Sequence, residues 1–545
     1  MDRLKALNEL TERARAGESV WPEEIRDVLR QNDEAICVIA RLTLLDGSRR
    51  DFAIPFLLSD NEFLRDFLRA QLYNILSAYS GQAMELYLPM PQTDLRWTEV
   101  RAALRSLTGR EYEKAFRVAR RLCAAEGGHF TGIGFRQLSA WEPLPPRVVP
   151  APRPLAPRLR EAAREGARGL RCGLDVGGTD IKIVLSRDGA LLLAEEMDWD
   201  PSRAETAEEL IGAILDLVRR SLETALPGEE ARPLSLGLSF PDVVIRDRIL
   251  GGETPKTRGL RARHSGQDYE KELLELSGLN DRLAALCRPG SRVHALNDGS
   301  MAAFSAAVEL ACAGEDAALE QGVFAHSLGT DLGSGWLRAD GTVPQIPLEL
   351  YDLLIDLGSF PQRERDAEDL RSTCNENSGL PGARRYLGQA AAYRLAWERR
   401  PSLLEGETEE RDGILQIRSS PEDRRKPCLE QLMRRAEAGD DDARAVFRQI
   451  GEHLGHISRE IQILLAPETE RRYLFGRFVR HPGCFRLLQE GCQAVMPELE
   501  LVAADEELAA SPLMRALAAR GEGSVARFGQ AVGAIYYGLY AEEDT

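Results

Sequence analysis

The chain has 545 residues, of which 43% are hydrophobic, and its formal net charge is −17. This length and composition predict a globular protein of several domains. The negative charge disfavours broad affinity for nucleic acid or anionic membranes, although a local basic patch remains compatible with it.

No apolar run approaches the ~20 residues that a membrane-spanning helix needs, and the first residues lack the apolar core of a signal peptide. We therefore expect a cytoplasmic protein with no membrane or nucleic-acid partner. The nine cysteines include no Cys-x-x-Cys pair, so neither a disulfide framework nor a thiolate metal site is expected.

Residues 1–142 predict an α+β domain with no catalytic constellation and an unknown role. Two strands are expected within residues 36–56, joined at Asp46-Gly47, because a turn dipeptide separates two apolar runs. Helical periodicity flanks them at residues 2–31, 62–78 and 97–125. This part could serve partner binding or formation of a homo-oligomer.

Residues 143–170 are rich in proline and arginine and predict a linker. Proline lacks a backbone N–H and has a fixed φ, so a proline run disfavours both helix and central strand. We place a domain boundary here.

Beyond the linker, strands alternate with helices, which predicts a mixed sheet covered on both faces. The expected strands are residues 172–176, 181–186, 190–196, 234–240 and 293–297. The expected helices are residues 204–225 and 269–286.

The first two of these strands flank the turn Asp175-x-Gly177-Gly178-Thr179. Glycine has no Cβ to hold an anion away, so a phosphate can approach the backbone N–H groups of such a turn. The pattern is not a P-loop, because a strand follows and no Gly-Lys-Ser/Thr triplet closes the turn. A plain β-hairpin is the alternative interpretation.

A similar order recurs later in the chain. Strands at residues 323–327 and 335–338 flank a second glycine-rich turn, Leu328 to Gly335, followed by a helix at 441–465, a strand at 473–476 and a helix at 525–539. Two similar halves that each open with a phosphate-sized turn predict a cleft between them, which would be a nucleotide site.

Five motifs occur in the order typical of the ROK family of bacterial sugar kinases and sugar-responsive repressors. They are Asp175 to Lys182, Leu236 to Val244 with Glu253-Thr254-Pro255-Lys256, Asn297-Asp298 with Ala302-Ala303, Ala466-Pro467 with Tyr473 to Gly476, and Gly529 to Ala534. The chain resembles this family over roughly residues 170–545.

The resemblance implies an α/β fold of two ribonuclease-H-like lobes, residues 171–312 and 313–545, with a nucleotide cleft between them. It implies ATP and Mg²⁺ as cofactors and a small-molecule sugar as substrate. The family's Cys-rich zinc loop is absent after Glu349, so no zinc is expected.

The resemblance also assigns site residues. Asp298 would be the general base, with a helix N-cap as the alternative. Asn297, Lys256 and Glu349 would bind the sugar, and Asp175 would hold Mg²⁺ through water. The remaining nucleotide-binding residues would be Gly177, Gly178, Thr179, Lys182, Gly329, Thr330, Gly333 and Gly476.

Two questions stay open at this point. Lys256 stands where the family commonly has Asn, near Arg258, Arg261 and Arg263, which favours an anionic substrate unless this is simply a solvated loop. The activity expected is ATP-dependent phosphorylation of a small sugar or polyol. The alternative is a non-catalytic, sugar-sensing or nucleotide-binding regulator on the same fold.

Overall fold

A computed structural model of the chain describes most of its residues. The described ranges are 2–58, 61–91, 93–105, 112–145, 154–228, 231–251, 257–329, 332–358, 365–375, 379–419, 422–521 and 523–542.

The contacts divide the chain into two compact units. Unit 1 comprises Met1–Val148, Ile346–Ala466 and Glu490–Pro497, and unit 2 comprises Val149–Gln345, Pro467–Gln489 and Glu498–Thr545. This division differs from the predicted lobe of residues 313–545, because residues 346–466 pack with the N-terminal region. Both predicted sheets lie in unit 2.

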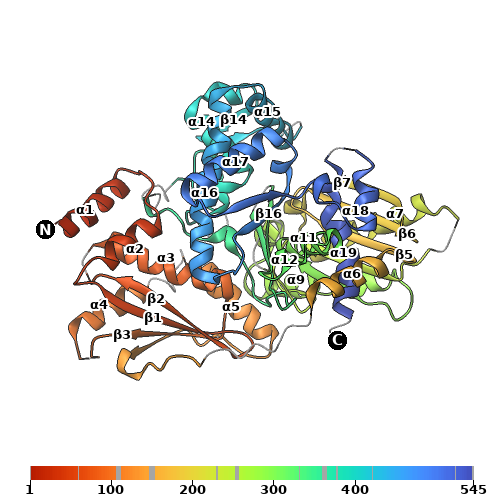
Figure 1. Cartoon of the computed structure of the whole chain (residues 1–545). Helices are drawn as coiled ribbons and strands as arrows, with labels where there is room; N and C mark the ends of the chain where they lie inside the picture. The colour runs from red at the N-terminus through yellow and green to blue at the C-terminus, as the bar shows by residue number, and fades with distance from the viewer. Residues whose placement is uncertain are drawn as a thin grey trace. The chain divides into compact units, whose positions relative to one another are not determined.

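The first sheet of unit 2 has the strand order β11-β8-β5-β6-β7. Its strands β5, β6 and β7 are labelled in Figure 1. Its strands are β5 (Leu170–Val176), β6 (Asp180–Arg187), β7 (Ala190–Asp198), β8 (Ser235–Phe240) and β11 (Val293–Asn297). The first three form an antiparallel meander, whereas β8 runs parallel to β5 and β11 runs parallel to β8. This is the predicted ribonuclease-H-like arrangement.

The second sheet repeats this plan. Its order is β13-β12-β16-β17, formed by β12 (Val323–Leu328), β13 (Leu332–Leu337), β16 (Arg471–Gly476) and β17 (Glu500–Ala503). β13 is antiparallel to β12, while β16 runs parallel to β12 and β17 parallel to β16. The sheet therefore matches strands β6, β5, β8 and β11 of the first sheet in order and direction.

Two helices cover these sheets from within unit 2. Helix α11 (Asp298–Ala313) packs on β12 and β13, and α19 (Ser524–Glu542) packs on β5 and β8. Glycines permit this close packing, since a Cβ on Gly173 would lie 1.9 Å from the carbonyl oxygen of Ala531 and one on Gly237 would lie 1.8 Å from that of Ala534. The core around α11 and α19 is rich in Ala, which also allows short helix separations.

The opposite face of the first sheet packs on α7 (Ala207–Ala225), α9 (Gly266–Leu276) and α10 (Leu279–Ala284). Thr206 caps α7 by accepting the N–H of Glu209. Unit 2 also contains β9 (Val244–Ile245), β10 (Arg248–Ile249), α8 (Arg258–Arg263), α12 (Asp316–Leu319) and α18 (Pro512–Ala518), and α17 (Pro482–Val495) begins in it.

The prediction of a linker at residues 143–170 is wrong for its second half, which forms a helix. Helix α6 spans Leu155–Gly166 and buries Leu159 and Ala163 in the core beside α11 and α19. Pro157 is the third residue of this helix, where the backbone N–H would have no intrahelical partner, so proline is tolerated.

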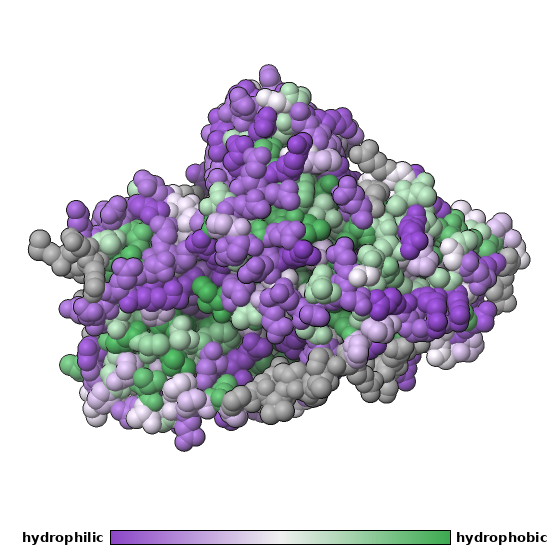
Figure 2. Space-filling view, viewed as in Figure 1, coloured by the Kyte–Doolittle hydropathy of each residue, from purple (hydrophilic) through white to green (hydrophobic). Residues whose placement is uncertain are grey.

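Unit 1 contains a four-stranded sheet of order β2-β1-β3-β4. Its strands are β1 (Ile36–Thr43), β2 (Arg49–Phe56), β3 (Ala83–Leu88) and β4 (Ile133–Gln137), and its N-terminal helices are α1 (Asp2–Arg15), α2 (Pro22–Arg30), α3 (Glu62–Tyr79), α4 (Leu95–Arg105) and α5 (Glu113–Ala125). Hydrophobic residues gather over this sheet on the face seen in Figure 2.

Residues 346–466 complete unit 1. They form α13 (Arg384–Leu387), α14 (Gln389–Arg399), β14 (Thr408–Arg411), β15 (Ile414–Ile417), α15 (Arg425–Glu437) and α16 (Asp441–Leu465). Their first segment lies along α3, where Leu348 N–H donates to the carbonyl oxygen of Ala78 and Asn74 exchanges two hydrogen bonds with Leu354.

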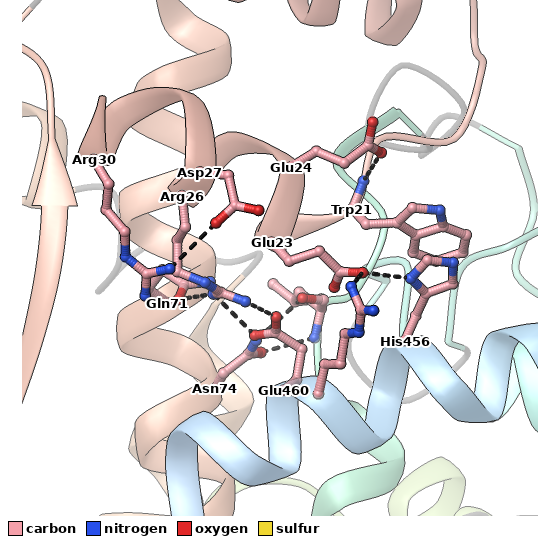
Figure 3. Close-up of polar contacts among 12 residues, drawn as sticks. Trp21, Glu23, Glu24, Arg26, Asp27, Arg30, Gln71, Asn74, His456 and Glu460 are labelled. Carbon is pink, nitrogen blue, oxygen red and sulfur yellow. Dashed lines mark hydrogen bonds and ion pairs between the residues drawn. The ribbon is translucent and has the colours of Figure 1, made fainter. Parts of the chain in front are cut away.

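Helix α2 is joined to α16 by a buried polar cluster (Figure 3). Arg26 forms an ion pair with Glu460, and both side chains are almost fully buried. The Trp21 ring stacks on His456 with centroids 4.0 Å apart, and the Nδ1 of His456 lies 2.7 Å from Glu23 Oε1. The N-terminal region is therefore bound to the later segment by specific contacts rather than appended to it.

No helix among the described residues is both long enough and apolar enough to cross a membrane.

Candidate functional site

The first glycine turn joins β5 to β6 as a tight hairpin. Gly177 N–H donates to the carbonyl oxygen of Asp180 at 2.7 Å, and a Cβ on Gly177 would lie 2.8 Å from that oxygen. The Nε1 of Trp199 donates to the Gly177 carbonyl at 3.0 Å. Among the described residues, the amides of Gly178 and Thr179 have no hydrogen-bond partner. Two N–H donors at the tip of the turn are therefore available to an anion.

Charged side chains surround the base of this turn. Asp175 accepts a hydrogen bond from Ser239 Oγ at 2.8 Å, and Lys182 Nζ lies 3.5 Å from Asp175 and 2.5 Å from Asp180. Burial raises the pKa of Asp175, and Lys182 opposes that rise. Burial works to lower the pKa of Lys182, but Asp175 and Asp180 outweigh it and raise that pKa. Lys182 is thus a charged counter-ion within the turn.

A group of carboxylates that the sequence analysis missed adjoins this turn. One carboxylate oxygen each from Asp180, Glu196 and Asp198 lie within 4.8 Å of one another. Asp180 faces Asp198 directly across the β6–β7 ladder, and Arg527 forms an ion pair with Glu196. The signal in the sequence was Asp180 at the first position of one strand and Glu196 and Asp198 at alternating positions of the next. The three oxygens could hold a divalent cation.

Asn297 and Asp298 lie at the start of α11, directly after β11. Asn297 is the N-cap, because its Oδ1 accepts the N–H of Gly299 at 3.0 Å, while its Nδ2 donates to the carbonyl oxygen of Asp242 at 2.9 Å. Asp298 Oδ1 lies 2.8 Å from the same N–H. Since Asn297 fills the N-cap position, the half-buried carboxylate of Asp298 is not required as the cap.

The second glycine turn lies against Asp298. A Cβ on Gly333 would lie 2.8 Å from Asp298 Oδ1, so only a glycine lets β13 approach this carboxylate so closely. Gly299 and Gly335 provide equally close backbone contact, since a Cβ on Gly335 would lie 2.1 Å from the Gly299 carbonyl. Thr330 lies outside the described residues. The structure therefore brings Asp298 and the second turn together.

The register of the first sheet relates this pair to the first turn. Asp175 faces Ser239, and Ser239 faces Leu296, two residues before Asp298. Two strand spacings amount to about 10 Å. Because β5, β8 and β11 are parallel, their carboxyl ends lie at the same edge, which is where ligands bind in α/β sheets.

Gly476 ends β16 beside the second turn. It has a φ of 98° and faces Leu328, whose carbonyl oxygen would lie 2.3 Å from a Cβ at this position. The preceding residue, Phe475, lies next to Gly529 of α19, since a Cβ on Gly529 would lie 3.7 Å from the Phe475 ring and 3.6 Å from Met514 Cε. Gly476 therefore belongs to the same edge of the second sheet as Gly329 and Gly333.

Two further residues, Glu349 and Lys256, were predicted to bind the sugar. Glu349 lies in unit 1, where it accepts a hydrogen bond from Tyr351 at 2.7 Å and lies 3.7 Å from Lys114 Nζ. Lys256 lies outside the described residues. Of the basic residues near it, Arg261 donates to Thr257 and Arg263 pairs with Glu205.

Comparison with known proteins gives structural matches only. No family model and no curated protein matches the chain. A ROK family glucokinase from Streptomyces griseus, solved with glucose and AMPPNP, is 18% identical, with a TM-score of 0.42 over 67% of this chain and 98% of that chain. A ROK hexokinase from Thermus thermophilus is 17% identical, with a TM-score of 0.38 over 67% and 98%.

A further match is a ROK family transcriptional regulator, a homologue of the E. coli MLC protein. It is 13% identical, with a TM-score of 0.40 over 88% of this chain and 100% of that chain. The predicted fold of two similar α/β sheets is confirmed by the strand orders of this structure itself. At these identities and TM-scores, the matches carry no argument about this chain.

The residues present fit a magnesium–nucleotide ligand. The free amides of Gly178 and Thr179 suit a phosphate, and the lysine among the carboxylates of the first turn supplies positive charge beside it. The carboxylates of Asp175 and Asp180, with Glu196 and Asp198 next to them, are of the donor type that Mg²⁺ prefers.

Proposed function

We propose that the protein is an ATP-dependent kinase for a small sugar or similar polyol, with Asp298 as the general base. The observation that carries this proposal is the contact between Asp298 and Gly333 of the second glycine turn. This contact supports the proposal because a half-buried carboxylate next to Gly333, about two strand spacings from the first turn, would lie near a phosphate held between the two turns.

Phosphoryl transfer depends mainly on positioning and charge stabilisation. The amides of Gly178 and Thr179 and the backbone of the second turn would hold the phosphates. Lys182 would offset their charge, with Asp175 and the neighbouring carboxylates holding Mg²⁺. ATP supplies the phosphoryl group and Mg²⁺ neutralises its oxygens when both are bound.

Asp298 would take the proton from the acceptor hydroxyl as that oxygen bonds to the γ-phosphorus and the bond to the ADP oxygen breaks. Asn297 would act indirectly, because its amide already caps α11 and contacts Asp242. Its role would be to fix the orientation of the first turn of α11 and thereby of Asp298.

The test is a coupled ADP-release assay over a panel of neutral, amino and acidic sugars. We expect at least one sugar to stimulate ADP release in the wild type, and Asp298→Asn to lower kcat by about 10²–10⁴-fold while the protein stays folded. Asp268→Asn, on the exposed surface of α9, is the matched control.

Nucleotide binding is measured separately through the fluorescence of Trp199, whose indole donates to the Gly177 carbonyl. If nucleotide binds but no sugar stimulates turnover, the kinase proposal fails and the regulator is the better description. If Asp298→Asn turns over as fast as the wild type, the general-base assignment fails.

The preference for an anionic substrate now depends mainly on Lys256, because Arg261 and Arg263 have partners within their own region. Under this hypothesis Lys256→Ala raises KM for acidic sugars and leaves KM for neutral sugars unchanged. Equal KM changes for both classes would contradict it.

A further inference from the structure

Glu309, three turns after Asp298 on α11, is a buried carboxylate that the proposed reaction does not use. It is 1% exposed, and its Oε2 accepts the backbone N–H groups of Ala510 and Ser511, both at 2.6 Å. Burial raises the pKa of Glu309, and the two N–H groups oppose that rise. Glu309 therefore binds α11 to the segment that leads into α18.

A tyrosine of α19 joins the same cluster. Tyr536 donates from its hydroxyl to Ser511 Oγ at 2.9 Å and accepts the N–H of Leu513 at 3.1 Å. Ser511 Oγ also accepts the N–H of Met514 at 3.3 Å and so caps α18. Ser511 and Tyr536 are fully buried, which makes each of these bonds costly to lose.

This cluster is one of several connections between α11 and α19, which also include the packing of Phe304 against Tyr537 and Tyr540. At the beginning of α11, Gln530 Nε2 donates to the carbonyl oxygen of Asp298 at 3.3 Å. In the middle, the helices cross so closely that a Cβ on Gly533 would lie 1.7 Å from Ser305 Oγ. At the far end, Glu309 is connected to Tyr536 through Ser511. The contacts at Asp298, Ser305 and Glu309 follow one another in the same order along both helices.

The cluster also connects α11 with the nucleotide side of the proposed site. Met514, whose N–H donates to Ser511 Oγ, lies beside Gly529, and Gly529 lies beside Phe475. Phe475 immediately precedes Gly476 at the end of β16. A displacement of α18 would therefore shift Gly529 and Phe475, and with them the end of β16 at Gly476. It would also shift α19, whose Gln530 is hydrogen-bonded to the backbone of Asp298.

We propose that Glu309 is a positioning residue that holds α11, α18 and α19 in one frame and so fixes Asp298 relative to the nucleotide side of the site. The role in catalysis rests on the proposed kinase function, but the mechanical role does not. The mechanical role and the catalytic role are therefore tested by separate measurements.

The mechanical test uses Glu309→Leu, which keeps side-chain volume but leaves two buried N–H groups unpaired, and Glu309→Gln, whose amide oxygen can still accept them. Hydrogen exchange of the ligand-free protein is followed at residues 299–302 and 510–514. We expect Glu309→Leu to speed exchange in both segments roughly tenfold, and Glu309→Gln to stay within about twofold of the wild type.

A purely local capping role predicts faster exchange at residues 510–514 alone. That result would overturn the proposal even if no sugar were ever phosphorylated. Glu223→Leu, an exposed residue of α7, is the matched control and should leave both segments unchanged.

The functional test measures kcat and both KM values well below the unfolding temperature of each variant. We expect Glu309→Leu to lower kcat and raise KM for ATP by about tenfold each, with KM for the sugar unchanged and Glu309→Gln restoring both. A variant that unfolds earlier but keeps wild-type kinetic constants would overturn the catalytic role. A wild type that binds nucleotide without turnover would instead count against the kinase function, and the exchange data would still decide the mechanical role.

Discussion

The two glycine turns of unit 2 occupy equivalent places in two similar sheets but are built by different means. The first turn, at Gly177, is surrounded by charge, with Lys182 between Asp175 and Asp180. The second turn is fixed by close packing, since Gly333 and Gly335 lie directly against the first residues of α11. Changes of charge should therefore disturb the first turn, and changes of side-chain size the second.

Gly335→Ala should have the largest effect. The added Cβ would lie 2.1 Å from the backbone of Gly299 and of Ser300, and neither backbone can move without displacing α11. We expect no stable unit 2, seen as insoluble protein or loss of a cooperative unfolding transition. Gly329→Ala, in the same turn, is the control. A Cβ at Gly329 would have no atom within 4 Å, so this variant should keep the solubility and the unfolding transition of the wild type. Equal behaviour of the two variants would contradict the packing argument.

Lys182→Met should be next in size. It leaves Asp175 and Asp180 without their counter-ion, which we expect to cost about 3 kcal/mol in the free energy of unfolding, measured in urea. Lys182→Arg keeps the charge and should recover part of the loss. If Lys182→Met proved as stable as the exposed control Lys271→Met, Lys182 would not be the counter-ion of this turn.

His326, on β12 behind the second turn, gives a smaller and pH-dependent effect. Its Nδ1 lies 2.9 Å from Ser334 Oγ, and burial, with Arg472 nearby, lowers its pKa to about 3. A depressed folded-state pKa stabilises the fold above the unfolded value near 6.5, and the stabilisation is lost as the pH falls towards 3.

At pH 5, this loss should reach about 2 kcal/mol of unfolding free energy relative to pH 7.5. His326→Asn should reduce the pH dependence by that amount, whereas the exposed His129→Asn should not change it. An unchanged slope in His326→Asn would mean that His326 titrates equally in the folded and unfolded states.

Gly177→Ala should have the smallest effect on stability, about 1 kcal/mol. Its Cβ would lie 2.8 Å from the Asp180 carbonyl, but this contact is within one hairpin that can adjust. Urea denaturation should show a smaller loss of unfolding free energy for Gly177→Ala than for Lys182→Met. A loss as severe as that of Gly335→Ala would remove the distinction between the two turns.

Much of this architecture was predictable because it is local. The glycine turn after Asp175 and the strand–helix junction at Asn297-Asp298 follow from short patterns of apolar residues, glycine and a capping residue. Both lie where the sequence placed them. The start of α6 was missed because proline is unfavourable in a helix interior but harmless in its first turn.

The tertiary features were not predictable from local pattern. Nothing near Glu349 indicates that it pairs with Lys114, more than 200 positions earlier, in unit 1. Gly335 resembles any strand glycine until α11 is seen to lie against it. The carboxylates of Asp180, Glu196 and Asp198 become a group only through the register of β6 and β7. These contacts depend on pairing between distant segments.

The hydrogen bonds between α3 and residues 346–357 have a consequence for synthesis on the ribosome. The hydrogen-bond partners of Ala78 and Asn74 are Leu348 and Leu354, which are synthesised about 270 residues later. At ~5–20 residues per second, this takes roughly 15–55 s. During that time the nascent N-terminal region presents an uncovered helix surface, which makes it a candidate for chaperone binding before unit 1 can close.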